Sequence, residues 1–402
     1  MNILFVSAWF PFPPINGAKI RIYNLIRELA KYHDISLLSF TRVIPINDAI
    51  SSFEYLKKYC QPIGVIPWKI YKRNSLSAIR GLFSDMPSSV FYSYDKSMLM
   101  NIEHTIKSNH FDLIIGSEAG PPSIVSYLVS RTRAIPKVID AIEIGILKDA
   151  YYKQNLAVKR LRSGLTWFKL KNFTGRILKN ASAITVPSLI EKENLETILP
   201  GHIPIEVIPH SLDLDHYLGD FGEVQPNLIS FMGSLTYEPN FDAVNYLLND
   251  MYPHIKSGID DVKLQIIGNT AGFEKKLQID GSVKFTGLVS DIRPPIAQSW
   301  LSVVPLRIGA GTRLKVIESM ALGTPVVSTS KGAEGLDVVN GKNILISDEP
   351  NEFADNVIKV IKNPGLRKEL SIEGLKLVKE KYSSVVIGQR YNSFLNTIIP
   401  RK

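Results

Sequence analysis

Short apolar runs of strand type alternate with helical stretches along most of the chain. The run Asn2–Ala8 is followed by Ala18–Tyr32, where apolar residues recur at helical spacing. Strands that alternate with helices predict parallel sheets with right-handed crossovers, so the predicted fold class is α/β and doubly wound. The other apolar runs are Ile35–Phe40, Gly64–Ile66, Leu113–Gly116, Val138–Asp140, Ala183–Val186, Leu228–Met232, Leu264–Ile267, Ser302–Leu306 and Val326–Thr329.

The pattern divides into two halves. Ile203–Asp215 has the character of a crossover, and strand and helix patterns resume after it. A helix is predicted over Phe241–Ile255, and the pattern is helical from Asn351 onward, ending with a helix over about Val385–Ile398. A length of 402 residues with 45% hydrophobic content suits two domains of ordinary size.

The segment richest in candidate ligand-binding residues lies between two predicted strands of the second half. Gly309 and Gly311 allow the backbone to approach a ligand closely, and a helix over Arg313–Leu322 follows. This helix is apolar nearly all round, yet it carries Arg313, Lys315 and Glu318 close to its start. Since buried charges are costly unless paired or bound to a ligand, the pattern predicts an anion site for a diphosphate at the helix N-terminus.

Lys315 and Glu318 lie three residues apart, so they share one side of the helix. They could bind a phosphate and a sugar hydroxyl of one nucleotide, or they could simply pair with each other. The segment is not a P-loop, because no Gly-Lys-Ser/Thr follows the glycines. It is not a dinucleotide fingerprint either, since Leu314 stands in place of the third glycine.

The whole segment from Gly309 to Val327, GAGTRLKVIESMALGTPVV, resembles the donor-site signature of family 4 glycosyltransferases and their sugar-transferase relatives. The resemblance implies a GT-B fold, in which two facing Rossmann-like domains enclose a deep cleft. It also implies a retaining reaction with a UDP- or GDP-linked sugar as co-substrate, without a metal or another cofactor. Many members have two glutamates bracketing seven residues, and here Ala310 replaces the first of them.

The resemblance also implies that the two domains bind different substrates. Residues 1–205 would bind the acceptor, residues 206–384 would bind the nucleotide-sugar donor, and the helix over about 385–402 would pack back on the first domain.

The resemblance assigns Glu318 to the nucleotide ribose. Many members have a basic pair shortly after the position of Gly233, where this chain has Thr236, Tyr237 and Glu238. Arg313 and Lys315 are therefore predicted to carry the diphosphate and to act in catalysis. The complete set of predicted donor residues is Gly17, Gly233, Ser234, Leu288, Val289, Gly309, Ala310, Gly311, Thr312, Arg313, Lys315 and Glu318.

Three residues are predicted on the acceptor side. Asp140 ends an apolar run, and it is also predicted to be catalytic because related transferases have an Asp or His facing the acceptor in this region. Glu118 lies in a glycine-flanked loop, and His210 replaces the Asn of a family Pro-Asn-Gly-Val-Asp element. Helix capping or turn formation is the alternative for the two carboxylates, and a structural histidine is the alternative for His210.

Most of the net charge of +9 lies in one segment of the chain. Residues 148–179 contain nine basic residues and one acid, Asp149, which gives 9 − 1 = +8, and aromatic residues are interleaved among them. A cationic, aromatic helix can lie on an anionic membrane surface, and this is the predicted partner. A solvated helix face is the alternative. Nucleic acid is not predicted, because no base-reading motif accompanies the segment.

The single cysteine, Cys60, excludes an intramolecular disulfide, and the N-terminal residues are typical of a first strand rather than a signal peptide. The predicted protein is a cytoplasmic hexosyltransferase, peripheral at the inner face of the plasma membrane. It would transfer sugar to a glycan or lipid-linked acceptor in bacterial cell-surface polysaccharide synthesis. A nucleotide-sugar epimerase or hydrolase of the same fold, or a non-catalytic nucleotide-binding subunit of an assembly complex, is the alternative.

Overall fold

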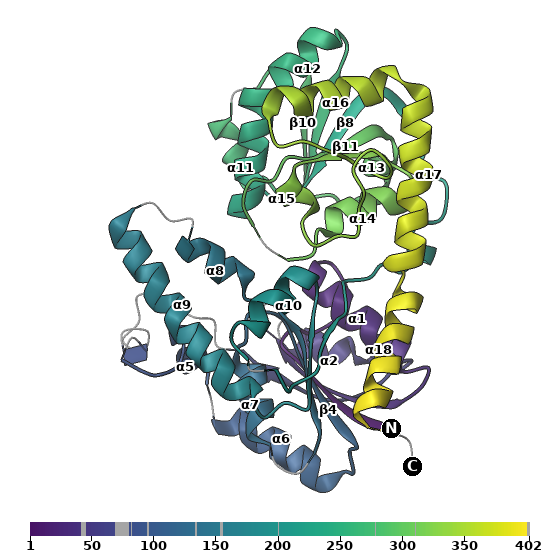
Figure 1. The fold of residues 1–402 in the computed structure, drawn as a ribbon. Coiled ribbons are helices and arrows are strands. Elements are labelled where there is room, and N and C mark those ends of the chain that lie inside the picture. Colours follow the sequence, from purple (N-terminus) through teal and green to yellow (C-terminus); the bar gives the residue numbers. More distant parts are fainter. Residues whose placement is uncertain are drawn as a thin grey trace. The chain divides into compact units, whose positions relative to one another are not determined.

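The structure is a computed structural model, which describes residues 1–41, 46–68, 80–81, 83–94, 96–132, 135–152, 156–199, 201–277, 279–309 and 311–399. The chain forms two compact units (Figure 1). The first consists of Met1–Ser211 and Ile387–Lys402, and the second of Leu212–Val386. The sequence pattern places these boundaries at 205/206 and 384/385.

The first unit is built on a seven-stranded parallel sheet with the order β3-β2-β1-β4-β5-β6-β7. The strands are β1 Asn2–Ser7, β2 Asp34–Thr41, β3 Gln61–Pro67, β4 Leu113–Gly120, β5 Lys137–Ile142, β6 Ala183–Val186 and β7 Ile205–Val207. The helices are α1 Gly17–Leu29, α2 Ile46–Ser51, α3 Phe53–Leu56, α5 Ser88–Ser93, α6 Lys96–Ser108, α7 Ile124–Arg131, α8 Gly145–Tyr152, α9 Ala157–Leu178, α10 Leu189–Glu196 and α18 Ser384–Ile398.

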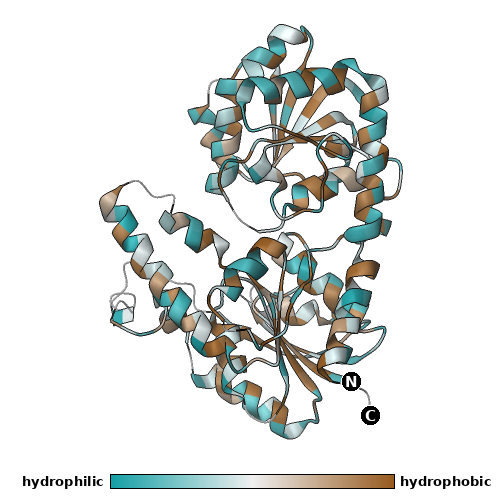
Figure 2. Cartoon of the chain, viewed as in Figure 1, coloured by the Kyte–Doolittle hydropathy of each residue, from teal (hydrophilic) through white to brown (hydrophobic). Residues whose placement is uncertain are grey.

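Both faces of this sheet are buried, which explains why its strands are continuous apolar runs. Leu4 and Val6 of β1 join a core with α7 and α9, whereas Ile3 and Phe5 join a core with α1 and α18. Hydrophobic residues accordingly dominate the central strands (Figure 2). Helix α18 is an integral part of the second of these cores.

The second unit holds a six-stranded parallel sheet with the order β10-β9-β8-β11-β12-β13. The strands are β8 Gln225–Met232, β9 Lys263–Ile267, β10 Val283–Gly287, β11 Ser299–Val304, β12 Val326–Ser328 and β13 Leu345–Ile346. The helices are η1 Leu214–Tyr217, α11 Glu238–Tyr246, η2 Leu247–Met251, α12 Tyr252–Gly258, η3 Phe273–Lys276, α13 Arg293–Ala297, α14 Leu314–Ala321, α15 Ser330–Ala333, α16 Pro350–Lys362 and α17 Pro364–Lys381.

The predicted doubly wound α/β class is confirmed by these two Rossmann-like parallel sheets. One predicted element is wrong in detail, because the single helix expected over Phe241–Ile255 is interrupted. A π-helical turn, Leu247–Met251, separates α11 from α12, and Pro253 lies at the start of α12. Proline lacks the N–H that a continuous helix needs at that point.

Candidate functional site

The predicted donor site is centred on α14, which begins after the cap residue Arg313. Gly309 and Gly311 precede it with φ values of 114° and 87°, in the left-handed region that favours glycine. A Cβ on Gly309 would lie 3.3 Å from Cβ of Pro239, so the turn also packs closely on the start of α11. Ala310 lies outside the described residues, and its predicted role stays a prediction.

Lys315 connects α14 to the first turn of α11. Its Nζ donates to Oδ1 of Asn240 at 2.7 Å and lies 4.7 Å from the centre of the Phe231 ring. Asn240 in turn donates through Nδ2 to the carbonyl oxygen of Ser234 at 2.9 Å. Burial, and secondly the charge of Arg313, lower the pKa of Lys315 to about 7. The fold therefore brings the predicted residues Ser234 and Lys315 together through Asn240, which the sequence pattern did not identify.

Glu318 has a different partner from Lys315. The Tyr217 hydroxyl, on η1, donates to its Oε1 at 2.9 Å, and the side chain is buried. Burial raises the pKa of Glu318 to about 7, although the Tyr217 hydrogen bond and the Lys315 charge act in the opposite direction. The alternative in which Lys315 and Glu318 simply pair with each other is thus wrong, because each is held by another group.

Arg313 and Thr312 complete the start of the helix. Arg313 is buried, and its Nη2 donates to the carbonyl oxygen of Gly309 at 3.0 Å and contacts Oε2 of Glu334 at 3.2 Å. The Thr312 hydroxyl is also buried, and it has no hydrogen-bond partner within the described part of the chain. A cation and a hydroxyl thus lie at the N-terminus of α14, the end of a helix that favours an anion.

The other predicted donor residues lie in loops at strand ends. A Cβ on Gly268 would lie 2.7 Å from the carbonyl oxygen of Gly233, so these two turns are in close contact. Leu288 and Val289 follow β10, and the Leu288 side chain is exposed. Gly17 is the first residue of α1, in the first unit. The roles of these residues in donor binding stay predictions.

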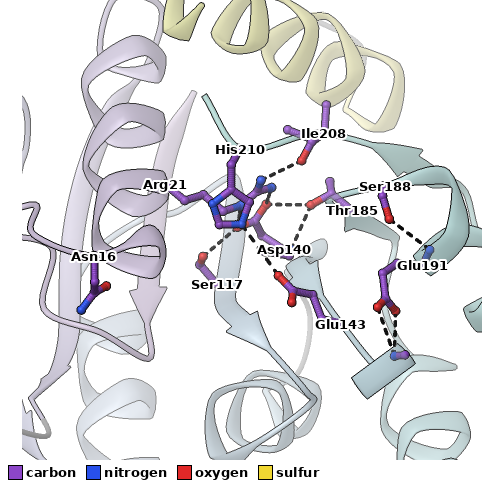
Figure 3. Close-up of polar contacts among 12 residues, drawn as sticks. Asn16, Arg21, Ser117, Asp140, Glu143, Thr185, Ser188, Glu191, Ile208 and His210 are labelled. Atoms are coloured by element: carbon purple, nitrogen blue, oxygen red, sulfur yellow. Dashed lines mark hydrogen bonds and ion pairs between the residues drawn. The ribbon is translucent and has the colours of Figure 1, made fainter. Parts of the chain in front are cut away.

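Asp140 requires a correction. Its side chain is fully buried, and its Oδ1 lies 2.7 Å from Nη2 of Arg21 in an ion pair (Figure 3). The Ser117 and Thr185 hydroxyls also donate to it, at 2.7 and 2.6 Å. Because the carboxylate has no exposed surface and is held by three groups, it cannot contact an acceptor directly. Asp140 is a structural anchor rather than the predicted catalytic residue.

Glu118 is a second correction on the acceptor side. Its carboxylate accepts hydrogen bonds from the amides of Ser123 and Ser126, at 2.9 and 2.6 Å, at the start of α7. Both serine hydroxyls donate to it as well. These contacts are those of a helix cap, so helix capping, the alternative predicted for Glu118, describes this carboxylate.

His210, the third acceptor-side residue, lies just after β7 and is buried. Its Nε2 is 3.7 Å from Oε1 of Glu143, which follows β5 (Figure 3). The structure therefore places His210 and Glu143 together at the carboxyl ends of two strands of one sheet.

Neither a metal-binding group of side chains nor a membrane-spanning helix occurs among the described residues. Within these ranges, no group of three or more His, Cys, Asp and Glu side chains could hold a metal ion. No helix in the same part of the chain is long and apolar enough to cross a membrane.

The two doubly wound units match the fold of solved GT-B glycosyltransferase structures, and the family match and relatives indicate a glycosyltransferase. Residues 226–363 match the family model of the glycosyl transferases group 1. This match supports the predicted GT-B sugar transferase.

Relatives match over nearly the whole length. An uncharacterized 44.6 kDa protein in the cps region of Klebsiella pneumoniae is 24% identical, over 95% of this chain and 97% of its own. An uncharacterized glycosyltransferase of Methanocaldococcus jannaschii is 21% identical, over 97% of each chain. Among solved structures, the Anabaena protein HepE in complex with UDP and glucose has a TM-score of 0.65 at 16% identity, over 99% of this chain and 100% of its own.

Proposed function

We propose that the protein is a retaining glycosyltransferase that transfers a sugar from a UDP- or GDP-linked donor to a glycan or lipid-linked acceptor in cell-surface polysaccharide synthesis. The observation that carries this proposal is the separation of Lys315 from Glu318, which Asn240 and Tyr217 hold as two independent polar groups. The cps-region relative and the UDP-bound Anabaena structure support the pathway and the nucleotide.

In the proposed reaction, Lys315 and Arg313 stabilise the negative charge that gathers on the leaving diphosphate as the glycosidic bond breaks. The acceptor hydroxyl attacks from the same face, and its proton passes to an oxygen of the leaving phosphate. The mechanism needs no side-chain nucleophile. We propose no metal in it.

A thermal-shift panel of nucleoside diphosphates and their sugars tests the donor class, because selective binding stabilises the fold. Acceptor addition then separates a transferase from an epimerase, a hydrolase and an idle subunit. We expect release of nucleotide from the donor to require the acceptor. Release at the same rate without acceptor would contradict the transferase proposal.

Glu318→Gln is expected to weaken nucleoside binding by about 1.5–3 kcal/mol, the value of a lost charge-assisted hydrogen bond. Uridine and guanosine are the appropriate probes, because they lack phosphates and do not sense Lys315. Since the pKa of Glu318 is raised to about 7, wild-type affinity should fall as the pH drops below 7 and the carboxylate is protonated. Isothermal titration at several pH values should find the Gln variant weak and insensitive to pH. Wild-type affinity in the variant would contradict the ribose role.

We also propose that α9 binds an anionic membrane surface. Leu161, Leu165 and Phe168 form an exposed apolar stripe at helical spacing on this helix. The exposed basic residues of the same helix and its C-cap are Lys159, Arg160, Arg162, Lys171, Arg176 and Lys179. An apolar stripe flanked by cations is the pattern of a helix that lies in the plane of a membrane interface.

Charge reversal at Arg160, Arg162 and Lys171 is expected to weaken binding to phosphatidylserine vesicles by about 1 kcal/mol per charge, or about 100-fold in total. Lys169 is left unchanged because its Nζ donates to the carbonyl oxygen of Gly81 at 3.0 Å. Reversal of Lys359, Lys362 and Lys368, exposed on α16 and α17, is the matched control. Equal loss in both triple variants, measured by vesicle sedimentation, would contradict a specific role for α9.

A further inference from the structure

The segment Ile208–Ser211, which follows β7, is held at both ends by α1. Nη1 of Arg21 donates to the carbonyl oxygen of Ile208 at 2.7 Å. Nδ2 of Asn24 donates to the carbonyl oxygen of Ser211 at 2.9 Å. His210 lies between these two attachments, so its backbone has little freedom.

The residue that holds Ile208 is itself fixed from three strands. Asp140 on β5 binds Arg21 through both carboxylate oxygens, at 2.7 and 3.3 Å (Figure 3). Ser117 on β4 and Thr185 on β6 donate to the same carboxylate. The buried network therefore forms a rigid support for the segment that carries His210.

The imidazole at this supported position has unused hydrogen-bonding capacity. Only 5% of His210 is exposed, and neither ring nitrogen has a hydrogen-bond partner within the described ranges. The distance of 3.7 Å from Nε2 to Oε1 of Glu143 is too long for a direct hydrogen bond. Buried polar groups are nearly always paired, because an unpaired one destabilises the fold. A rigid support that presents an unpaired imidazole indicates a ligand-binding position.

We propose that His210 and Glu143 form a binding site for one hydroxyl group of the sugar acceptor. A hydroxyl oxygen placed about 2.8 Å from both atoms would accept from Nε2–H of His210 and donate to the Glu143 carboxylate. This inference rests on the proposed function, because it names how the acceptor of that reaction is held.

The chemistry of the pair selects a neutral hydroxyl. A phosphate or carboxylate would be repelled by Glu143, whose side chain is itself only 14% exposed. An ammonium group would satisfy Glu143 but has no acceptor for the imidazole N–H. A hydroxyl is both donor and acceptor, so it satisfies both members at once.

The first test uses His210→Leu, which replaces the unpaired imidazole with an apolar side chain. Removal of a buried, unsatisfied polar group is neutral or stabilising, so we expect the Tm to be unchanged or higher. The matched control is His33→Leu, since His33 is also buried in this unit but is hydrogen-bonded to Asn392 at 2.8 Å. Its Tm should fall. A fall of equal size for His210→Leu would show a structural histidine and overturn the inference.

The second test follows the imidazole signals of the full-length protein by NMR during titration with methyl glycosides of glucose, galactose, mannose and N-acetylglucosamine. We expect at least one glycoside to shift the His210 signal saturably while the His33 signal stays in place. Glu143→Gln should weaken that binding about tenfold, as expected for the loss of a hydrogen bond to a charged group. No shift of His210 with any of the four glycosides, or an equal shift of His33, would overturn the inference.

These experiments need no donor, so they are independent of the nucleotide site. UDP and GDP binding is measured in the same samples by thermal shift. If the wild-type protein binds neither UDP nor GDP, the proposed donor site is wrong. If it binds a nucleotide but no glycoside shifts the His210 signal, only the acceptor site at His210 and Glu143 is wrong.

Discussion

Replacement of Lys315 by alanine is expected to lower the turnover rate by about 100-fold or more, the scale of losing one group that stabilises a developing anion. Lys315 is the cation that donates to Asn240 on α11, and in the described part of the chain it forms no ion pair with Glu318, although the nearby Glu318 charge raises its pKa. Its charge matters most when the bond to the leaving diphosphate breaks. Donor affinity in the ground state should therefore fall less than the rate, because only differential binding accelerates the reaction.

Single-turnover rates for Lys315→Ala, Arg313→Ala and Arg307→Ala measure this directly. Arg313→Ala should lose activity on the same scale, because Arg313 is buried at the helix cap. Arg307 is the matched control, since it is a partly exposed cation whose guanidinium is paired with Asp242 at 2.6 Å. If Lys315→Ala and Arg313→Ala both turn over at the wild-type rate, the diphosphate is held elsewhere.

The pH dependence of kcat/KM should also report the charge of Lys315. The pKa of Lys315 is lowered to about 7, so the side chain loses its proton, and its charge, as the pH rises through 7. Donor capture, measured as kcat/KM, should consequently decline above pH 7 in the wild type. The decline should be absent in Lys315→Ala.

The strands, the family signature and the charged helix start could be predicted from the sequence because each is a local pattern. The partners of the charged groups could not. Lys315 is held by Asn240, 75 residues away in the chain, and Glu318 by Tyr217, 101 residues away. Such contacts depend on the order of strands in the sheet, which local periodicity does not contain.

Asp140 shows why a strand-end carboxylate is ambiguous from sequence. The apolar run Val138–Asp140 was compatible with a strand that ends at the aspartate. In the structure β5 continues to Ile142, and Asp140 is one of its buried interior positions. Its partner Arg21 lies 119 residues earlier on α1, where an apolar stripe was the visible signal. The sequence pattern does not predict a buried arginine at that position, and without this partner the aspartate suggests a functional role.

The buried pair leads to the second large expected effect. Asp140→Ala should lower the free energy of unfolding of the first unit by about 3–5 kcal/mol, because it leaves the Arg21 charge buried and uncompensated. Hydrogen exchange of the full chain measures this. The amides of β4, β5 and β6 should lose protection, whereas those of β8 and β11 in the second unit serve as the control.

The double variant Arg21→Met with Asp140→Leu distinguishes a charge effect from a packing effect. Removal of both members of a buried ion pair is often neutral or stabilising, so the double variant should recover most of the lost stability. Arg21 also holds the Ile208 carbonyl, however, and the recovered protein should have a less ordered His210 segment.

Burial alone would raise the pKa of Asp140, but Arg21, Thr185 and Ser117 together keep it below its usual value. The wild-type pair thus stabilises the fold above pH 4, and this stability is lost as the pH falls through the lowered pKa. The double variant should lose less stability in acid. Equal acid sensitivity of wild type and double variant would show that other groups control the acid unfolding of this unit.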